Sequence, residues 1–164
     1  NVAISPVPSG RLWIAFDDQS NDIHAVRTNT SATKFGEVRL IRTPNASAAV
    51  FHIGVEGTRA RADVVFNDQE RIWHQQVIAG LTLKAAPAKW NGDNALTVKF
   101  KVTDAGAAVN GAKVKARWNG QIKTCTTSST GVCKLSFPRM GKTTIKVTGK
   151  KSGYAPDEVR LRVT

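Results

Sequence analysis

The sequence predicts an all-β protein built from two units, and three observations support this prediction. Short runs of strand-forming residues recur along the chain, separated by Gly, Asn, Asp, Pro and Ser. No stretch of about a dozen residues keeps the apolar spacing of a helix. The charge also changes abruptly: residues 1–80 contain 8 basic and 8 acidic side chains, whereas residues 81–164 contain 16 and 4. We therefore expect one β unit at residues 1–80 and a second at residues 81–164.

Thirteen runs are predicted to be strands. They cover residues 11–17, 23–28, 37–42, 48–55, 62–66, 71–78, 81–84, 96–102, 112–118, 122–125, 132–137, 143–148 and 158–163. No window approaches the roughly 18 apolar residues of a membrane-spanning helix, so no transmembrane segment is expected. The absence of an initiator Met or a signal peptide before Asn1 indicates a processed or excised N-terminus.

The strands of the second unit alternate cleanly between apolar and polar residues. Val98, Phe100 and Val102 share one face of their strand, and Lys99 and Lys101 share the other. Successive side chains of a strand point to opposite faces, so this pattern predicts half-buried antiparallel sheets with basic outer faces. Seven such strands in 84 residues favour a two-sheet sandwich.

The first unit has continuous apolar runs instead, at residues 12–16 and 48–51. Continuous runs are typical of strands that are covered on both faces. Either stacked sheets or radially packed sheets would provide this cover.

The two cysteines, Cys125 and Cys133, flank a turn-rich loop between two predicted strands. The turn can bring the two Cβ atoms together, so we expect a disulfide across a hairpin. The alternative is a pair of free thiols in a cytosolic protein. A metal site is not expected, because no further Cys or His lies nearby. A disulfide would indicate secretion or a cell-surface location.

Residues 81–164 resemble the bacterial immunoglobulin-like modules of secreted and surface proteins. The resemblance rests on Gly111–Ala112–Lys113–Val114, on the turn from Cys125 to Cys133, on Gly141 to Val147, and on Gly153–Tyr154. It implies an immunoglobulin-like β-sandwich, and it says little about function, because such modules act as spacers, adhesins and docking domains.

Residues 1–80 resemble the last part of a sialidase-type β-propeller. Gly10 to Phe16 is similar to an inner propeller strand. Residues 28–35 are similar to an Asp-box, the hairpin turn of such blades. The motif positions are occupied by Thr28, Thr30, Ala32 and Phe35, so the Asp of the motif is missing. Eighty residues make fewer than two blades, whereas closure takes at least about four. The unit is therefore either the end of a longer propeller or a small independent β-sandwich.

The resemblance does not transfer a catalytic site. A sialidase needs a Tyr nucleophile beside clustered arginines, and the only tyrosine, Tyr154, lies in the second unit. No catalytic residue and no cofactor is predicted, and this chain alone is not expected to be an enzyme.

Two candidate binding features lie in the second unit. The first is a set of five basic residues predicted on outward strand faces: Lys99, Lys101, Lys113, Lys115 and Arg117. They could form a face that binds a polyanion, or an ordinary solvated face whose lysines discourage strand pairing between molecules. Trp90 lies in a polar stretch. It could stack on a sugar ring, or it could fold back over the end of the sandwich. Nucleic acid is not favoured as a ligand, because aromatic residues are sparse among the lysines.

Two metal sites were considered and are not favoured. His24, His52 and His74 could form a zinc site only if all three met, and separate strand histidines are the simpler interpretation. Asp17, Asp18 and Asp22 could hold calcium, but without a recognised ligand spacing an ordinary turn is the stronger interpretation.

These observations favour a non-catalytic, secreted or cell-surface binding and assembly module. Its basic second unit would contact an acidic polysaccharide or a cell-envelope polymer. One alternative is the C-terminal portion of a sialidase-like glycoside hydrolase whose catalytic blades are absent from this chain, because they are lost or lie on another polypeptide. Another is a structural subunit of a surface fibre or layer, in which sheet edges pair between copies. The expected partners are accordingly the acidic polymer, the remaining blades of a propeller, or further copies of the chain.

Overall fold

A computed structural model of the chain describes residues 1–18, 20, 22–41, 49–68 and 71–164. Every regular element in this part of the chain is a β-strand, so the all-β prediction is confirmed. The chain divides into two compact units, Asn1–Gly80 and Leu81–Thr164. None of the residues that the structure describes belongs to a helix that could span a membrane.

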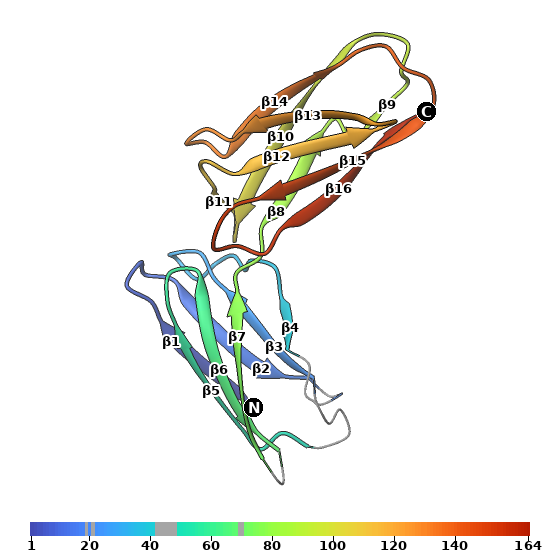
Figure 1. Cartoon of the computed structure of the whole chain (residues 1–164). Coiled ribbons are helices and arrows are strands. Elements are labelled where there is room, and N and C mark those ends of the chain that lie inside the picture. Colours follow the sequence, from blue (N-terminus) through green and yellow to red (C-terminus); the bar gives the residue numbers. More distant parts are fainter. Residues whose placement is uncertain (19, 21, 42–48, 69–70) are drawn as a thin grey trace. The chain divides into compact units, whose positions relative to one another are not determined.

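The first unit contains two open antiparallel sheets (Figure 1). Its strands are β1 (Val2–Pro6), β2 (Leu12–Asp17), β3 (Ile23–Arg27), β4 (Arg39–Ile41), β5 (His52–Gly57), β6 (Arg61–Asn67) and β7 (Ile72–Ile78). One sheet has the order β1-β2-β3-β4 and the other the order β5-β6-β7, so each is a simple meander. Short connections between neighbouring antiparallel strands account for this order.

The two sheets of the first unit share one core. Trp13 of β2 is fully buried, and its indole Nε1 donates a hydrogen bond of 3.1 Å to the carbonyl oxygen of Thr58, which follows β5. The backbone N–H of Gly57 donates to Ser5 Oγ at 2.9 Å. A Cβ atom on Gly57 would lie 2.5 Å from the Trp13 ring, so only glycine allows this approach. The described residues of the first unit thus form two sheets that pack on a shared core, and they do not show the propeller-like unit expected from the resemblance.

The hairpin that resembles an Asp-box is organised by an asparagine. Thr28 and Phe35 form an antiparallel bridge at its base. The side-chain oxygen of Asn29 accepts hydrogen bonds from the backbone N–H groups of Thr33 and Lys34, at 2.9 and 3.0 Å. An Asn side chain that binds its own turn is common in hairpins of many folds. The hairpin therefore does not indicate a propeller blade.

The apolar run at residues 12–16 is covered on one face only, contrary to expectation. Trp13 and Ala15 point inward and are fully buried, whereas the alternate residues of β2 are half-buried. Val2 and Ile4 of the neighbouring β1 lie on the same outer face and are 64% and 59% exposed. The prediction differs from the structure because the outer face of this sheet carries apolar residues, and no second layer above it is formed by the residues that the structure describes.

The second unit is a two-sheet sandwich. Its strands are β8 (Thr82–Ala86), β9 (Lys89–Trp90), β10 (Leu96–Asp104), β11 (Ala107–Ala108), β12 (Lys113–Trp118), β13 (Gln121–Thr126), β14 (Val132–Phe137), β15 (Thr143–Lys150) and β16 (Asp157–Val163). β8, β10, β11 and β14 form one sheet, and the other has the order β13-β12-β15-β16-β9. The unit has seven long strands, since β9 and β11 have two residues each. Of these seven, the first, second and fifth (β8, β10 and β14) face the third, fourth, sixth and seventh (β12, β13, β15 and β16). Immunoglobulin-like sandwiches divide about seven strands between two sheets in this way, although in the constant type the fourth strand lies with the first, second and fifth.

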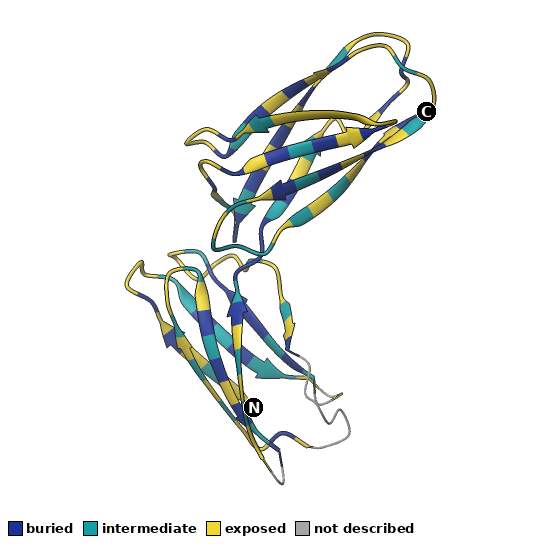
Figure 2. Ribbon diagram, in the orientation of Figure 1, coloured by how far each residue is buried: buried dark blue, intermediate teal, exposed yellow. Residues whose placement is uncertain are grey.

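The core of the second unit lies between these two sheets. Val98, Phe100 and Val102 of β10 are fully buried, whereas Lys99 and Lys101 between them are exposed. Figure 2 shows the same alternation of buried and exposed residues along the other long strands. The period of two in the sequence therefore places the lysines of this unit on its outer surfaces.

All thirteen predicted strands overlap strands of the structure. Arg42 and Ala48, at the ends of two of these predictions, lie outside the described residues. The three strands that were not predicted are β1, β9 and β11, of which two are only two residues long.

Candidate functional site

The five basic residues predicted to form one binding face lie on two different sheets. Lys99 and Lys101 belong to β10, whereas Lys113, Lys115 and Arg117 belong to β12. The chain crosses from one sheet to the other between these strands, so the two groups point outward from opposite sides of the sandwich. The prediction of a single five-residue face was wrong for this reason.

The outer face of the five-stranded sheet gathers more basic residues than the sequence pattern suggested. Strand alternation and register place on it one set of eight cations, which we call the cationic face: Lys89, Lys113, Lys115, Arg117, Lys146, Lys150, Arg160 and Arg162. All of residues 81–164 are described, and Glu158 is the one acidic residue among them on this face. Its carboxylate lies 2.7 Å from Lys146 Nζ.

Cations stand directly opposite one another across the strands of this face. The opposed pairs are Lys113 with Lys150, Arg117 with Lys146, Lys146 with Arg160, and Lys89 with Arg162. Like charges placed directly opposite destabilise a sheet, by an amount on the order of 0.2–1 kcal/mol per pair. Glu158 offsets this repulsion at Lys146, whereas the pairs Lys113 with Lys150 and Lys89 with Arg162 have no acidic residue of this face beside them in the register.

The centre of the cationic face is hollowed. A shallow depression of about 680 Å³ lies over β12, β13 and β15. Lys113, Lys115, Arg117, Lys146 and Lys150 line it, together with Ile122, Thr124, Thr148 and Glu158. The cations thus surround a space into which an extended ligand can settle.

The opposite sheet has a smaller basic surface, which we call the lysine face. It consists of Lys84, Lys99, Lys101 and Lys134, of which Lys84 stands opposite Lys101 and Lys134 stands opposite Lys99. Both faces are positive, so charge alone does not distinguish them. They differ in the number of cations, and the cationic face has a hollow at its centre.

Trp90 does not stand free for stacking on a sugar. Its side chain is 8% exposed and belongs to the core of the second unit. β9 pairs with the C-terminal strand β16, where Trp90 stands beside Val163 and its carbonyl accepts a hydrogen bond from Thr164 N–H at 2.9 Å. Of the two interpretations considered, the structure agrees with the Trp that folds over the end of the sandwich.

The disulfide between Cys125 and Cys133 is present, as predicted. Its Cα atoms are 6.0 Å apart. Cys125 lies on β13 and Cys133 on β14, which belong to different sheets. The bridge therefore links the two sheets at their edges, rather than two paired strands of one hairpin.

The three histidines do not gather. His24 Nε2 lies 2.9 Å from Asp18 Oδ2, and His74 Nε2 lies 2.8 Å from Asp63 Oδ1. His52 lies on β5, and no group of three or more metal-binding side chains occurs in the part of the chain that the structure describes. Each histidine is thus a strand residue with its own surroundings.

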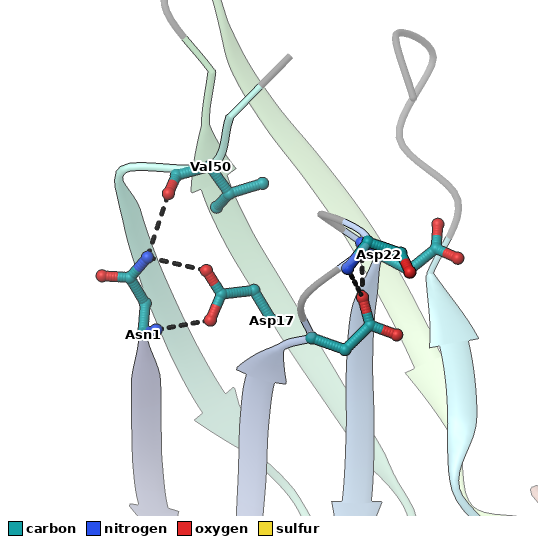
Figure 3. Close-up of polar contacts among 6 residues, drawn as sticks. Asn1, Asp17, Asp22 and Val50 are labelled. Atoms are coloured by element: carbon teal, nitrogen blue, oxygen red, sulfur yellow. Dashed lines mark hydrogen bonds and ion pairs between the residues drawn. The ribbon is translucent and has the colours of Figure 1, made fainter. Parts of the chain in front are cut away.

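Asp17, one of the three acidic residues considered for calcium, is occupied by the first residue of the chain (Figure 3). Its carboxylate pairs with the amino group of Asn1 and accepts a hydrogen bond of 2.8 Å from the Asn1 side-chain amide. The same amide also donates to the carbonyl oxygen of Val50 at 2.9 Å. Burial by itself raises the pKa of Asp17, but the hydrogen bonds from Asn1 outweigh it and lower the pKa.

The other two acidic residues form an ordinary turn. Asp18 Oδ1 accepts hydrogen bonds from the backbone N–H groups of Ser20 and Asp22, at 2.8 and 3.1 Å (Figure 3). The hydrogen bond with His24, followed by that from Ser20, lowers the pKa of the Asp18 carboxyl. A carboxylate that closes its own loop in this way needs no cation to explain it.

Sequence reasoning missed five of the eight residues of the cationic face. It did not single out Lys89, Lys146, Lys150, Arg160 and Arg162 as binding residues, although the alternation of their strands already placed most of them opposite buried residues. The missing information was the strand order, which places β15 beside β12 and β16 beside β15.

Comparisons with known proteins give distant structural likenesses. No family model matches the chain, and no curated protein matches it. Among solved structures, the adhesin InvE of Yersinia pseudotuberculosis is 10% identical with a TM-score of 0.38, and the D0-D1 domain of intimin is 17% identical with a TM-score of 0.34. A β-glucuronidase from glycoside hydrolase family 2 is 11% identical with a TM-score of 0.38. Each alignment covers 100% of this chain, but only 58% of the adhesin and 20% of the glucuronidase, against 98% of the intimin fragment.

Proposed function

We propose that this chain is a non-catalytic binding module, secreted or at a cell surface, whose cationic face contacts an acidic polysaccharide or cell-envelope polymer. The observation that supports the proposal is the composition of that face, which has eight cations and one acid, with five of the cations around a hollow. The disulfide supports a location outside the reducing cytosol.

Protection of sheet edges does not account for the cationic face. Lysines discourage pairing when they lie on edge strands. In the order β13-β12-β15-β16-β9, however, β12 and β15 are interior strands whose backbone groups are already paired on both sides. The five cations around the hollow all lie on these two strands. A role in binding explains their position better than a role in preventing aggregation.

The spacing of the cations favours a polymer over a small anion. Alternate residues of a strand are about 6.8 Å apart and neighbouring strands about 4.8 Å apart. Lys113, Lys115 and Arg117 therefore form a row beside the row of Lys146 and Lys150. Such rows do not converge on one point, and they match a linear chain with repeated negative charges.

The experiment compares two double variants with the same loss of charge. Lys115→Gln with Arg117→Gln removes two cations from the cationic face, and Lys99→Gln with Lys101→Gln removes two from the lysine face. Each lost contact is worth about 1 kcal/mol in water, so we expect the first variant to bind heparin roughly 30-fold more weakly. We expect the control to change the affinity less than 3-fold. Isothermal titration calorimetry at several salt concentrations measures both, and binding of the wild type should weaken as salt rises.

Equal losses in the two double variants would show that net charge, rather than this face, determines binding. Wild-type affinity that does not depend on salt, or no binding of any acidic polymer, would overturn the proposal itself. Thermal unfolding of each variant is the check on folding, and surface substitutions of this kind change stability by about 0.5 kcal/mol or less.

A further inference from the structure

On the edge strand β13, polar residues point toward the opposite sheet and an apolar residue points outward, which is the reverse of the pattern on the other long strands. Cys125 points toward the opposite sheet, where it bonds to Cys133, so Gln121 and Lys123 point to the same side. Both are nevertheless exposed, and the apolar Ile122 faces outward with 53% of its surface exposed. Two polar side chains thus occupy positions that core residues fill on the other long strands.

Because these side chains do not fill the core, a second hollow lies between β13 and β14, beyond the disulfide. Its volume is about 730 Å³. Phe137 packs against Trp118 with an edge-to-face contact of 5.3 Å between ring centroids, and both line this space. Lys123 Nζ donates a hydrogen bond to the carbonyl oxygen of Ser136 across it. The remaining lining combines apolar groups with amides and a guanidinium, in Ala95, Asn119, Gln121, Pro138, Arg139 and Met140.

A third depression lies next to both this hollow and the hollow of the cationic face. A depression of about 400 Å³ lies over the turn between β12 and β13. It shares Arg117 and Ile122 with the cationic hollow, and it shares Trp118, Asn119 and Gln121 with the hollow beyond the disulfide. The turn itself is tight, with positive φ angles of 41° at Asn119 and 77° at Gly120. Three neighbouring depressions, which we call the groove, therefore follow one another from the rows of lysines, over the turn, to Arg139.

We propose that the hollow beyond the disulfide is a sugar-binding subsite, and that the polymer bound by the cationic face is an acidic polysaccharide. This inference rests on the proposed function and specifies its ligand. The C–H face of a sugar ring would pack on Pro138 and Met140. Its hydroxyl groups would meet the amides of Asn119 and Gln121, and a carboxylate or sulfate would pair with the Arg139 guanidinium.

Other polyanions fit this groove less well. Inorganic polyphosphate has no apolar surface to place on Pro138 and Met140. Single-stranded nucleic acid relies on aromatic side chains whose faces stack with bases. Trp118 is 8% exposed and Phe137 1% exposed, so neither presents such a face. The mixed lining of the hollow thus favours sugar rings that carry acidic groups.

The test uses the full chain with two probes of equal charge, a heparin oligosaccharide and a linear inorganic polyphosphate. The variant Gln121→Ala with Arg139→Gln changes two exposed side chains of the subsite. Lys142→Gln is the matched control, because it removes one charge from the same connection without touching the hollow. We expect the subsite variant to bind heparin about 10-fold more weakly, the effect of losing one charge-assisted hydrogen bond. Its affinity for polyphosphate should match that of the control within 2-fold.

The outcomes separate this inference from the proposed function. Equal losses for heparin and polyphosphate, or no loss for heparin, would overturn the subsite, and the polar residues of β13 would then be protection of an edge strand. Loss of both affinities on substitution of Lys115 and Arg117 would still support the cationic face. If that substitution changed neither affinity, the proposed function would fail, and the subsite would fall with it.

Discussion

Removal of the disulfide tests how the second unit is held together. Replacing Cys125 and Cys133 by Ala opens a loop whose ends are eight residues apart in sequence. For a loop of this length the chain-entropy estimate gives a loss of about 2.5 kcal/mol in the free energy of unfolding. The loss should fall on the second unit alone, because both cysteines lie within Leu81–Thr164. For a unit of this size it corresponds to a decrease in Tm of roughly 10–20 °C.

Differential scanning calorimetry of the full chain measures this effect. We expect two transitions, one for each compact unit, of which one moves down in the double variant. Wild-type protein in excess reducing agent is the matched control and should show a similar shift. A decrease below about 2 °C, or equal movement of both transitions, would refute the reasoning that the bridge joins the edges of one sandwich.

Two further predictions concern local contacts. Thr127 Oγ1 donates to the carbonyl oxygen of Val109 at 2.7 Å and accepts from the N–H of Ala112 at 2.8 Å. Thr127→Val therefore leaves the carbonyl of Val109 and the N–H of Ala112 without this partner. We expect chemical denaturation to show that the free energy of unfolding falls by about 1–3 kcal/mol. A decrease below about 0.5 kcal/mol would contradict the role of these hydrogen bonds. In the first unit, NMR titration should place the pKa of Asp18 below its ordinary value of 3.8, and His24→Ala should return it toward that value. Because folding lowers the pKa of Asp18, its hydrogen bond with His24 stabilises the folded state above pH 3.8. This stabilisation is lost as the pH falls through the lowered pKa. An unchanged pKa in the His24 variant would exclude the hydrogen bond as the cause.

Much of the local structure of this chain could be predicted from its sequence. The alternation in residues 96–102 correctly placed Phe100 in the core and Lys99 outside, because a strand has a fixed period of two. The disulfide was predictable for the same local reason, since a short turn separates its two cysteines.

The errors concern contacts between distant parts of the sequence. Lys101 and Lys113 are close in the chain but lie on opposite sheets, because the chain crosses the sandwich between them. Trp90 is buried by a strand more than seventy residues later, and no local pattern around it could show this. The structure does not show the propeller-like unit expected at residues 1–80, and the sequence could not decide the point because hairpins and meanders occur in blades and sandwiches alike.

The central claim is that the outer face of β12 and β15 binds an acidic polysaccharide. NMR titration of the ¹⁵N-labelled chain with a heparin oligosaccharide tests it most directly. We predict that the largest shifts of backbone amide signals occur at Lys113, Lys115, Arg117, Lys146 and Lys150, and that they diminish at high salt. Shifts concentrated at Lys99 and Lys101, or in residues 1–80, would contradict it.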